Sequence, residues 1–243
     1  NVKKMLEGYS GNRLLFGLHD GHFRAENIGL NDGLPSFDLY YHPENNEEKE
    51  HFGRVALSVP GRHNVLNALA SAAAGFACGL TKEEIVKGLG TYNGAGRRFE
   101  YHCTVNGAIV ADDYGHHPDA YRVTFKTAKD LGFRRIIAIH QPHTFSRTKM
   151  LMDEFVEVLG TVDKVLIPPI YPARETNDEY NIYAEDVVAR LKNAEFMPDF
   201  EHIAHRIKEL AQPGDLFITL GCGDIYKAAI LTTQKYGEKK FLN

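Results

Sequence analysis

The sequence predicts an α/β protein with a mostly parallel, Rossmann-like sheet and flanking helices in its carboxy-terminal part. The main observation is that, after Phe99, short apolar runs alternate with amphipathic runs of helical length. Such alternation is typical of a parallel sheet with helices on both faces. Residues 1–89 differ, because strand-like runs come first and an alanine-rich helix follows them. A loop with three glycines, residues 90–96, separates the two patterns, so we expect domains at 1–95 and 96–243.

Strand-like runs dominate the chain up to Pro60. The candidate strands are residues 13–18, 22–30, 36–42 and 51–59. Asn31-Asp32-Gly33 lies between two of these runs, and turns of this kind favour an antiparallel or mixed sheet. The acidic stretch 44–50 is expected to form a solvated hairpin tip.

Two helices are expected before the glycine-rich loop. Pro60-Gly61 ends the strand pattern, and residues 62–78 are rich in alanine with apolar residues at helical spacing. Thr81 and Glu84 have the spacing of a capping box, which predicts a second helix that ends near Leu89.

The second half of the chain begins with a predicted β-hairpin. Asn106-Gly107 is a strong signal for a tight turn between strands at 99–105 and 108–111. Pro118 fits the first position of the helix that follows. The further helices are expected at 118–131, 146–159, 184–193, 200–211 and 225–236, and the further strands at 135–140, 164–168, 195–197 and 215–220.

Composition excludes several classes of protein. A net charge of −4 over 243 residues argues against a general nucleic-acid binder. Three cysteines without paired short spacing suit a reducing cytoplasm, and they favour neither a disulfide scaffold nor a zinc site. No apolar run approaches ~20 residues, so no membrane span is expected. The chain starts at Asn1 without an initiator Met, and we expect it to be a piece of a longer protein.

A polar turn at residues 112–124 is the leading candidate for a site. Two carboxylates, a phenol and two imidazoles follow a predicted strand there, and ligands of α/β sheets bind at the carboxyl ends of strands. The side chains are Asp112, Asp113, Tyr114, His116 and His117. A charged capping turn is one alternative. A metal-dependent hydrolase that uses the two Asp and two His side chains is another.

Three later turns also follow predicted strands. In the turn 141–148, Arg147 suits a carboxylate or a phosphate, and His140 and His143 lie beside it in the sequence. The alternative for this turn is helix capping by Thr144 or Ser146. Residues 171–175 are expected to form an exposed loop. Gly221-Cys222-Gly223-Asp224 is a weak phosphate signal and more often a tight turn.

Two further pairs suit a nucleotide. Asn64 and Asn67 lie at i and i+3 on one helix face, and their amides suit an adenine edge, although ordinary N-capping is an alternative. Arg97 and Arg98 follow the glycine-rich loop, and guanidinium groups match phosphate oxygens. A solvated basic pair is the alternative there.

Taken together, five motifs resemble the Mur ligase family. They are PGRHNVLN at 60–67, GRRFE at 96–100, DDYGHHP at 112–118, QPHTFSRT at 141–148 and GCGD at 221–224. The resemblance implies that residues 1–95 end a central ATP-binding domain and that 96–243 form the Rossmann-like, amino-acid-binding domain. The family's N-terminal domain and its P-loop are missing from this sequence. Cys222 stands where the family suggests a smaller residue.

The resemblance also implies a reaction. It is the ATP-dependent ligation of L-alanine to the lactyl carboxylate of UDP-N-acetylmuramate through an acyl phosphate, in cytoplasmic peptidoglycan precursor synthesis. The ligands of the Mg²⁺ ion are expected in the missing N-terminal part. Partners would be these small molecules and the missing domains of the same polypeptide, with neither nucleic acid nor membrane.

The resemblance assigns roles to individual residues. Those implied for ATP are Asn64 and Asn67 at the adenine, Arg98 at the phosphates and Asp113 at the ribose. Those implied for L-alanine are Tyr114, His116, His143 and Arg147, with Arg147 on the alanine carboxylate. We count His116 and Arg147 as catalytic, with His116 as the hypothetical acceptor of the amine's proton.

Two other functions remain open at this point. A related ligase adds a preformed peptide to the same sugar, which needs a larger pocket than Tyr114-Gly115 suggests. The chain is alternatively a non-catalytic nucleotide-binding module. Without the P-loop, we expect these 243 residues alone to lack ligase activity.

Overall fold

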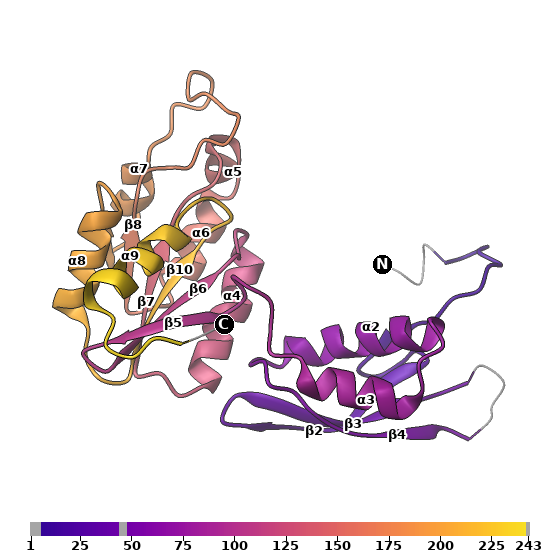
Figure 1. Ribbon diagram of the computed structural model, residues 1–243. Helices are drawn as coiled ribbons and strands as arrows, with labels where there is room; N and C mark the ends of the chain where they lie inside the picture. Colours follow the sequence, from indigo (N-terminus) through magenta and orange to yellow (C-terminus); the bar gives the residue numbers. More distant parts are fainter. Residues whose placement is uncertain (1–5, 44–47, 242–243) are drawn as a thin grey trace. The chain divides into compact units, whose positions relative to one another are not determined.

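The computed structural model describes residues 6–43 and 48–241, which divide into two compact units at residues 93 and 94 (Figure 1). Unit 1 runs to Asn93 and unit 2 starts at Gly94. Residues 44–47 of the expected hairpin tip lie outside the described residues. In the described part of the chain, no helix combines the length and apolarity needed to cross a bilayer.

Unit 1 contains a small mixed sheet, as the turn signals predicted. β1 pairs with β2 in parallel, and β2, β3 and β4 form an antiparallel meander. Asp32 and Gly33 both have positive φ, 49° and 76°, which produces the tight turn between β2 and β3. The strands are β1 (Phe16–Gly17), β2 (Phe23–Asn31), β3 (Leu34–Tyr41) and β4 (Glu50–Ala56), so only the first is much shorter than expected.

Two helices cover one face of this sheet (Figure 1). α2 (His63–Ala77) and α3 (Lys82–Thr91) pack on strand side chains such as Phe37 and Leu39, which are fully buried. The predicted capping box is present: the Thr81 hydroxyl accepts from Glu84 N–H at 3.2 Å, and the Glu84 carboxylate accepts from Thr81 N–H at 2.8 Å. α3 extends two residues beyond its expected end.

Unit 2 contains a six-stranded sheet in the order β5-β6-β10-β7-β8-β9. β5 is antiparallel to β6, and every other neighbouring pair is parallel. The predicted α/β class with a mostly parallel sheet is therefore confirmed. The strands are β5 (Glu100–Val105), β6 (Ala108–Asp113), β7 (Arg135–His140), β8 (Lys164–Ile167), β9 (Ala194–Phe196) and β10 (Asp215–Leu220).

The strand order brings distant turns together. β10, the last strand in the sequence, lies between β6 and β7. The turn that starts at Gly221 therefore lies between the turns after β6 and β7, which are the two polar turns of the sequence. The carboxyl ends of parallel strands meet at one sheet edge, where ligands of such sheets bind.

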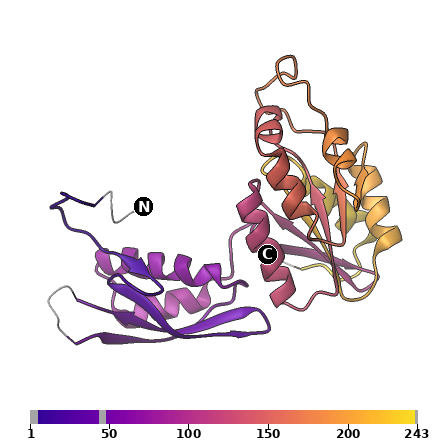
Figure 2. The same cartoon turned by 180° about the vertical axis from the view of Figure 1, so that it is seen from behind.

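Helices cover both faces of this sheet, and the two views show one face each (Figures 1 and 2). Apolar residues of α4, α6 and α7 form one core with the sheet, and those of α8 and α9 form the other. Pro118 starts α4, as expected. The helices are α4 (Pro118–Asp130), α5 (Phe145–Met150), α6 (Met152–Leu159), α7 (Ala184–Ala189), α8 (Phe200–Leu210) and α9 (Tyr226–Tyr236).

Two helix predictions were wrong in extent. The helix expected at 146–159 is divided at Leu151, whose φ and ψ of −107° and 20° leave the helical region. The helix expected to end at 193 ends at Ala189. There Asn193 is held outside the helix, because its side-chain amide donates to the carbonyls of Leu159 and Val162 at 3.2 and 2.7 Å.

Candidate functional site

Three turns meet at the carboxyl edge of the unit 2 sheet, and backbone hydrogen bonds join them. Gly221 N–H donates to the carbonyl of Asp113 at 3.3 Å, and Gln141 N–H donates to the carbonyl of Leu220 at 3.1 Å. The turns after β6 and β7 are thus both hydrogen-bonded to the end of β10, which fixes their backbones relative to each other.

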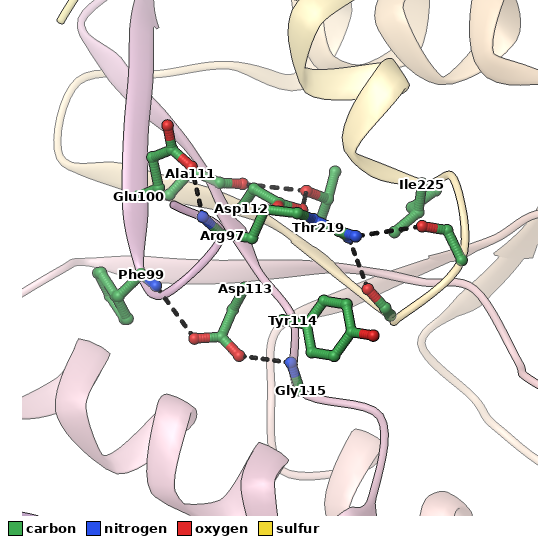
Figure 3. Close-up of polar contacts among 12 residues, drawn as sticks. Arg97, Phe99, Glu100, Ala111, Asp112, Asp113, Tyr114, Gly115, Thr219 and Ile225 are labelled. Carbon is green, nitrogen blue, oxygen red and sulfur yellow. Dashed lines mark hydrogen bonds and ion pairs between the residues drawn. The ribbon is translucent and has the colours of Figure 1, made fainter. Parts of the chain in front are cut away.

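Asp112, near the end of β6, forms an ion pair with the partly buried Arg97 (Figure 3). Asp112 is fully buried; its Oδ2 accepts from Arg97 Nε at 2.8 Å and its Oδ1 accepts from the Thr219 hydroxyl at 2.5 Å. The other guanidinium nitrogens of Arg97 donate to the carbonyls of Gly221 and Gly223 at 2.7 and 3.2 Å. The donors of the Arg97 guanidinium are therefore bound to other groups of the protein.

The backbone of Arg97 is equally constrained. Its φ is +61°, a conformation that non-glycine residues rarely adopt. Its N–H donates to Glu100 and its carbonyl accepts from Tyr114 N–H at 2.7 Å, while its guanidinium lies 4.6 Å from the Tyr226 ring centre. Arg97 thus joins the first residues of unit 2 to the turns after β6 and β10. Sequence reasoning considered both arginines for phosphate and did not detect this role.

Arg98 is in a different position from its neighbour. Its side chain is exposed, and its guanidinium lies 5.4 Å from the ring centre of Tyr114. Among the described residues, none hydrogen-bonds this guanidinium. Of the two arginines, Arg98 is the one whose donors are open to a ligand.

The carboxylate of Asp113 accepts two backbone hydrogen bonds (Figure 3). Oδ1 accepts from Gly115 N–H at 2.7 Å and Oδ2 accepts from Phe99 N–H at 3.1 Å. Burial raises the pKa of Asp113, while these two N–H groups and the charge of Arg98 oppose the rise. Each oxygen keeps one acceptor position, and the role of Asp113 at the ribose stays a prediction.

Tyr114 and His116 form the outer part of the first turn. His116 Nδ1 lies 3.0 Å from the carbonyl of Tyr114, and a carbonyl can only accept, so Nδ1 carries the hydrogen. In the neutral ring Nε2 is then an acceptor. Gly115 is required between them, because a Cβ there would lie 2.8 Å from Asp113 Oδ1. His117 instead caps α4, since its Nδ1 accepts from Asp119 N–H at 3.2 Å.

His140 faces the core and not the site. It is 1% exposed, and its Nδ1 lies 2.7 Å from the hydroxyl of Tyr121. Burial lowers the pKa of His140 to about 3, so the ring is neutral in the folded protein at neutral pH.

His143 and Arg147 lie together in the second turn. Arg147 Nη1 donates to the carbonyl of His143 at 3.1 Å, and the His143 ring stacks on Tyr171 with 5.4 Å between ring centres. Burial lowers the pKa of His143, and the charges of Arg147 and His116 lower it further. His143 Nδ1 is buried, with no hydrogen-bond partner among the described residues. The geometry therefore joins His143 directly to Arg147 within the second turn.

The loop after β8 is closely attached to this turn. Glu175 accepts hydrogen bonds from Thr144 and Ser146, and Tyr171 contacts His143. The expectation of an exposed loop is therefore wrong for Glu175 and Tyr171, which are partly buried. The capping alternative for Thr144 also fails, because its side chain makes no hydrogen bond that caps α5.

In unit 1, Asn64 and Asn67 line a pocket of about 480 Å³. Asn64 Nδ2 donates to the carbonyl of Pro60 at 2.7 Å, and Asn67 Nδ2 donates to Asn64 Oδ1 at 2.9 Å. Neither amide caps α2, whose N-cap is Arg62. The pocket walls include the apolar side chains Leu57, Val59, Ala68, Ile85 and Leu89. Apolar walls with a few amide groups suit a flat heteroaromatic base.

The residues of the hydrolase alternative do not converge. The two carboxylates have the partners described above, His116 contacts a carbonyl and His117 caps a helix. Over residues 6–43 and 48–241, no group of three or more metal-ligating side chains comes together.

The fold and these turns define a Rossmann-like α/β domain with polar turns at the carboxyl ends of its parallel strands. The family model of the Mur ligase glutamate ligase domain matches residues 97–223. The chain belongs to the Mur ligase family.

Two similar curated proteins carry the same name. The chain is 41% identical over 233 residues to UDP-N-acetylmuramate–L-alanine ligase of Acetivibrio thermocellus, covering 93% of the chain and 48% of that protein. It is 37% identical to the ligase of the same name from Clostridium novyi, covering 89% and 46%. The chain spans about half the length of the curated relatives it matches.

Solved structures agree on the fold. UDP-N-acetylmuramate–alanine ligase from Thermotoga maritima superposes with a TM-score of 0.71 at 24% identity, covering 92% of this chain and 48% of that one. UDP-N-acetylmuramoylalanyl-D-glutamyl-2,6-diaminopimelate–D-alanyl-D-alanyl ligase from Acinetobacter baumannii gives a TM-score of 0.72 at 18% identity, covering 96% of this chain and 49% of that one.

Proposed function

We propose that this chain is part of a ligase that joins L-alanine to the lactyl carboxylate of UDP-N-acetylmuramate with ATP. The observation that carries the proposal is that the turns with His116 and with His143 and Arg147 follow strands β6 and β7, which flank β10 and are joined to its end by backbone hydrogen bonds. The names of the curated relatives supply the identity of the substrates. Tyr114 forms a further wall of the proposed alanine pocket.

The proposed reaction needs no side-chain nucleophile. The lactyl carboxylate attacks the γ-phosphorus of ATP, and ADP leaves with formation of an acyl phosphate. The amino group of alanine attacks the acyl carbon, and the tetrahedral intermediate expels inorganic phosphate to leave an amide. Catalysis then depends on positioning and charge stabilisation.

Two residues of unit 2 have direct parts in this scheme. Arg147 pairs with the alanine carboxylate, which a guanidinium can bind through two hydrogen bonds. His116 accepts the proton that the amine loses, because its Nε2 is the free acceptor of the neutral ring.

We propose that ATP is bound mainly by three groups of this chain. The pocket lined by Asn64 and Asn67 is large enough for adenine and offers matching amide groups. The open guanidinium of Arg98 serves the phosphates, and Asp113 uses its remaining acceptor positions for the ribose hydroxyls. Mg²⁺, which shields the phosphate charge when bound, is assigned no ligand in this chain.

We propose that unit 1 is the end of a central ATP-binding domain and that unit 2 is the amino-acid-binding domain of a longer, cytoplasmic polypeptide. The P-loop is absent from these 243 residues, so the chain alone is expected to lack ligase activity. Alanine-dependent phosphate release by this chain alone would contradict that expectation.

The test of the function uses the full-length protein with ATP, Mg²⁺ and UDP-N-acetylmuramate. With L-alanine, mass spectrometry is expected to detect the sugar nucleotide extended by one alanyl residue. Product formation with a preformed tripeptide and none with L-alanine would instead assign the related peptide-adding activity.

A further inference from the structure

The loop after β8 holds the turn that carries Arg147. Tyr171 N–H donates to the carbonyl of Pro142 at 2.9 Å, and an isolated parallel bridge joins His143 to Tyr171. The two rings of that bridge stack with an angle of 9° between their planes. The loop therefore packs along the turn over several consecutive residues.

Glu175 makes the strongest polar contact between the two segments. Its Oε1 accepts from the hydroxyls of Thr144 and Ser146 at 2.6 and 2.5 Å, and its Oε2 accepts from the backbone N–H of Ser146 at 2.9 Å. These hydrogen bonds lower the pKa of Glu175, so the side chain is an anion at neutral pH.

This carboxylate replaces a local helix cap. Thr144 occupies the N-cap position of α5, but its hydroxyl donates to Glu175 and does not accept from α5. The first N–H groups of a helix need acceptors from outside the helix. A residue 29 positions later in the sequence supplies one of them at Ser146.

Arg147 depends on the start of α5 for its position. It directly follows Ser146, and its Nη1 donates to the carbonyl of His143 in the same turn. The three hydrogen bonds that Glu175 accepts hold Thr144 and Ser146, which lie between His143 and Arg147 in that turn. A misplacement of about 1 Å in a binding group can reduce catalysis strongly, so the fixation bears on the pocket.

We propose that Glu175 is a positioning residue for the amino-acid pocket. By holding Thr144 and Ser146, it sets the place from which Arg147 meets the ligand carboxylate. Its own oxygens are occupied by protein donors, so it acts through the turn. The inference rests on the proposed function, because it takes the carboxylate of the incoming amino acid as the partner of Arg147.

The experiment uses full-length ligase with Glu175→Ala, Glu175→Gln and the control Glu179→Ala. Glu179 is an exposed carboxylate of the same loop, without a hydrogen bond or ion pair among the described residues. The measured quantities are kcat, the KM values for L-alanine and ATP, and Tm.

Glu175→Ala is expected to raise the KM for L-alanine about tenfold while the KM for ATP stays within about twofold. Glu175→Gln is expected to rescue most of this loss. Its carbonyl oxygen can accept from Ser146 N–H, and the hydroxyls of Thr144 and Ser146 can turn to accept from its amide. Glu179→Ala is expected to leave all four quantities unchanged.

A role in stability alone predicts a different pattern. It would lower the Tm of Glu175→Ala and leave both KM values unchanged, and that result would overturn the proposal. A matching rise in both KM values would overturn it as well. Because Ser146→Ala removes one donor of the same cluster, its effect on the alanine KM is expected to be less than additive with that of Glu175→Ala.

Arg147→Ala separates this inference from the function on which it rests. If Arg147→Ala raises the KM for L-alanine and Glu175→Ala does not, the positioning role is wrong and the function stands. If wild-type full-length protein forms no ADP in response to L-alanine, the proposed function is wrong and the positioning role is wrong with it.

Discussion

The turns after β6 and β7 carry similar charged and imidazole side chains at one sheet edge, but they use them differently. Where β6 ends and its turn begins, the carboxylates of Asp112 and Asp113 accept hydrogen bonds from other groups of the protein. In the turn after β7, Arg147 donates one hydrogen bond, to the carbonyl of His143, and His143 Nδ1 has no partner among the described residues. The more heavily charged turn is thus the more structural one.

This difference indicates which side chains remain available to a ligand. Charge density in the sequence marks both turns, yet burial and occupied hydrogen-bond positions decide which groups remain available. Tyr114 and His116 of the first turn and Arg147 of the second are only partly buried. Asp112 near the end of β6 and His140 at the end of β7 are buried.

The largest effect is expected for Arg97→Ala. The change leaves the fully buried carboxylate of Asp112 without its cation, and breaking a buried ion pair costs about 3–5 kcal/mol. The free energy of unfolding of this chain, measured with urea, is expected to fall by that amount. Arg98→Ala is the matched control, because its side chain is exposed; equal losses for both variants would contradict the division of roles between them.

His116→Asn tests the available part of the same turn. Loss of the proton acceptor is expected to reduce kcat of the full-length ligase about 10²-fold and to change how the rate depends on pH. The free energy of unfolding should stay close to that of wild type. A variant with an unchanged pH–rate profile would remove His116 from the proposed proton transfer.

The low pKa of buried His140 is expected to make the free energy of unfolding depend on pH. Its pKa is about 3 in the folded protein and about 6.5 in the unfolded chain, so only the unfolded state binds this proton between those values. The contribution of neutral His140 to the free energy of unfolding is fully present above the pKa of the unfolded chain and is lost as pH falls toward 3. The expected loss between pH 7 and pH 5 is about 2 kcal/mol. Urea unfolding of wild type and His140→Phe at the two pH values measures it; equal pH dependence would contradict the assignment.

Local pattern was sufficient for much of the fold. The apolar run at 135–140 matches β7 in both bounds, Asn106-Gly107 forms the hairpin turn, and Pro118 begins α4. The place of β10 between β6 and β7 has no local signal, because strand order depends on contacts between residues far apart in the sequence. The early end of α7 has the same origin, since Asn193 is held by Leu159 and Val162.

The candidate site was predictable to the level of turns and not of contacts. Periodicity placed polar turns at strand ends, which is where the structure has them. Arg97 and Arg98 are chemically identical neighbours, and they differ in tertiary contacts such as the ion pair of Arg97 with Asp112 and its hydrogen bonds to the carbonyls of Gly221 and Gly223. Glu175 was missed because its partners, Thr144 and Ser146, lie about thirty positions earlier in the chain.

The most direct test of this account is the KM for L-alanine of full-length ligase carrying Arg147→Ala. We predict a rise of about a hundredfold, with little change in the KM for ATP, because a charge-assisted pair with the alanine carboxylate is lost. Equal rises for alanine and ATP would assign Arg147 to the nucleotide and contradict the account.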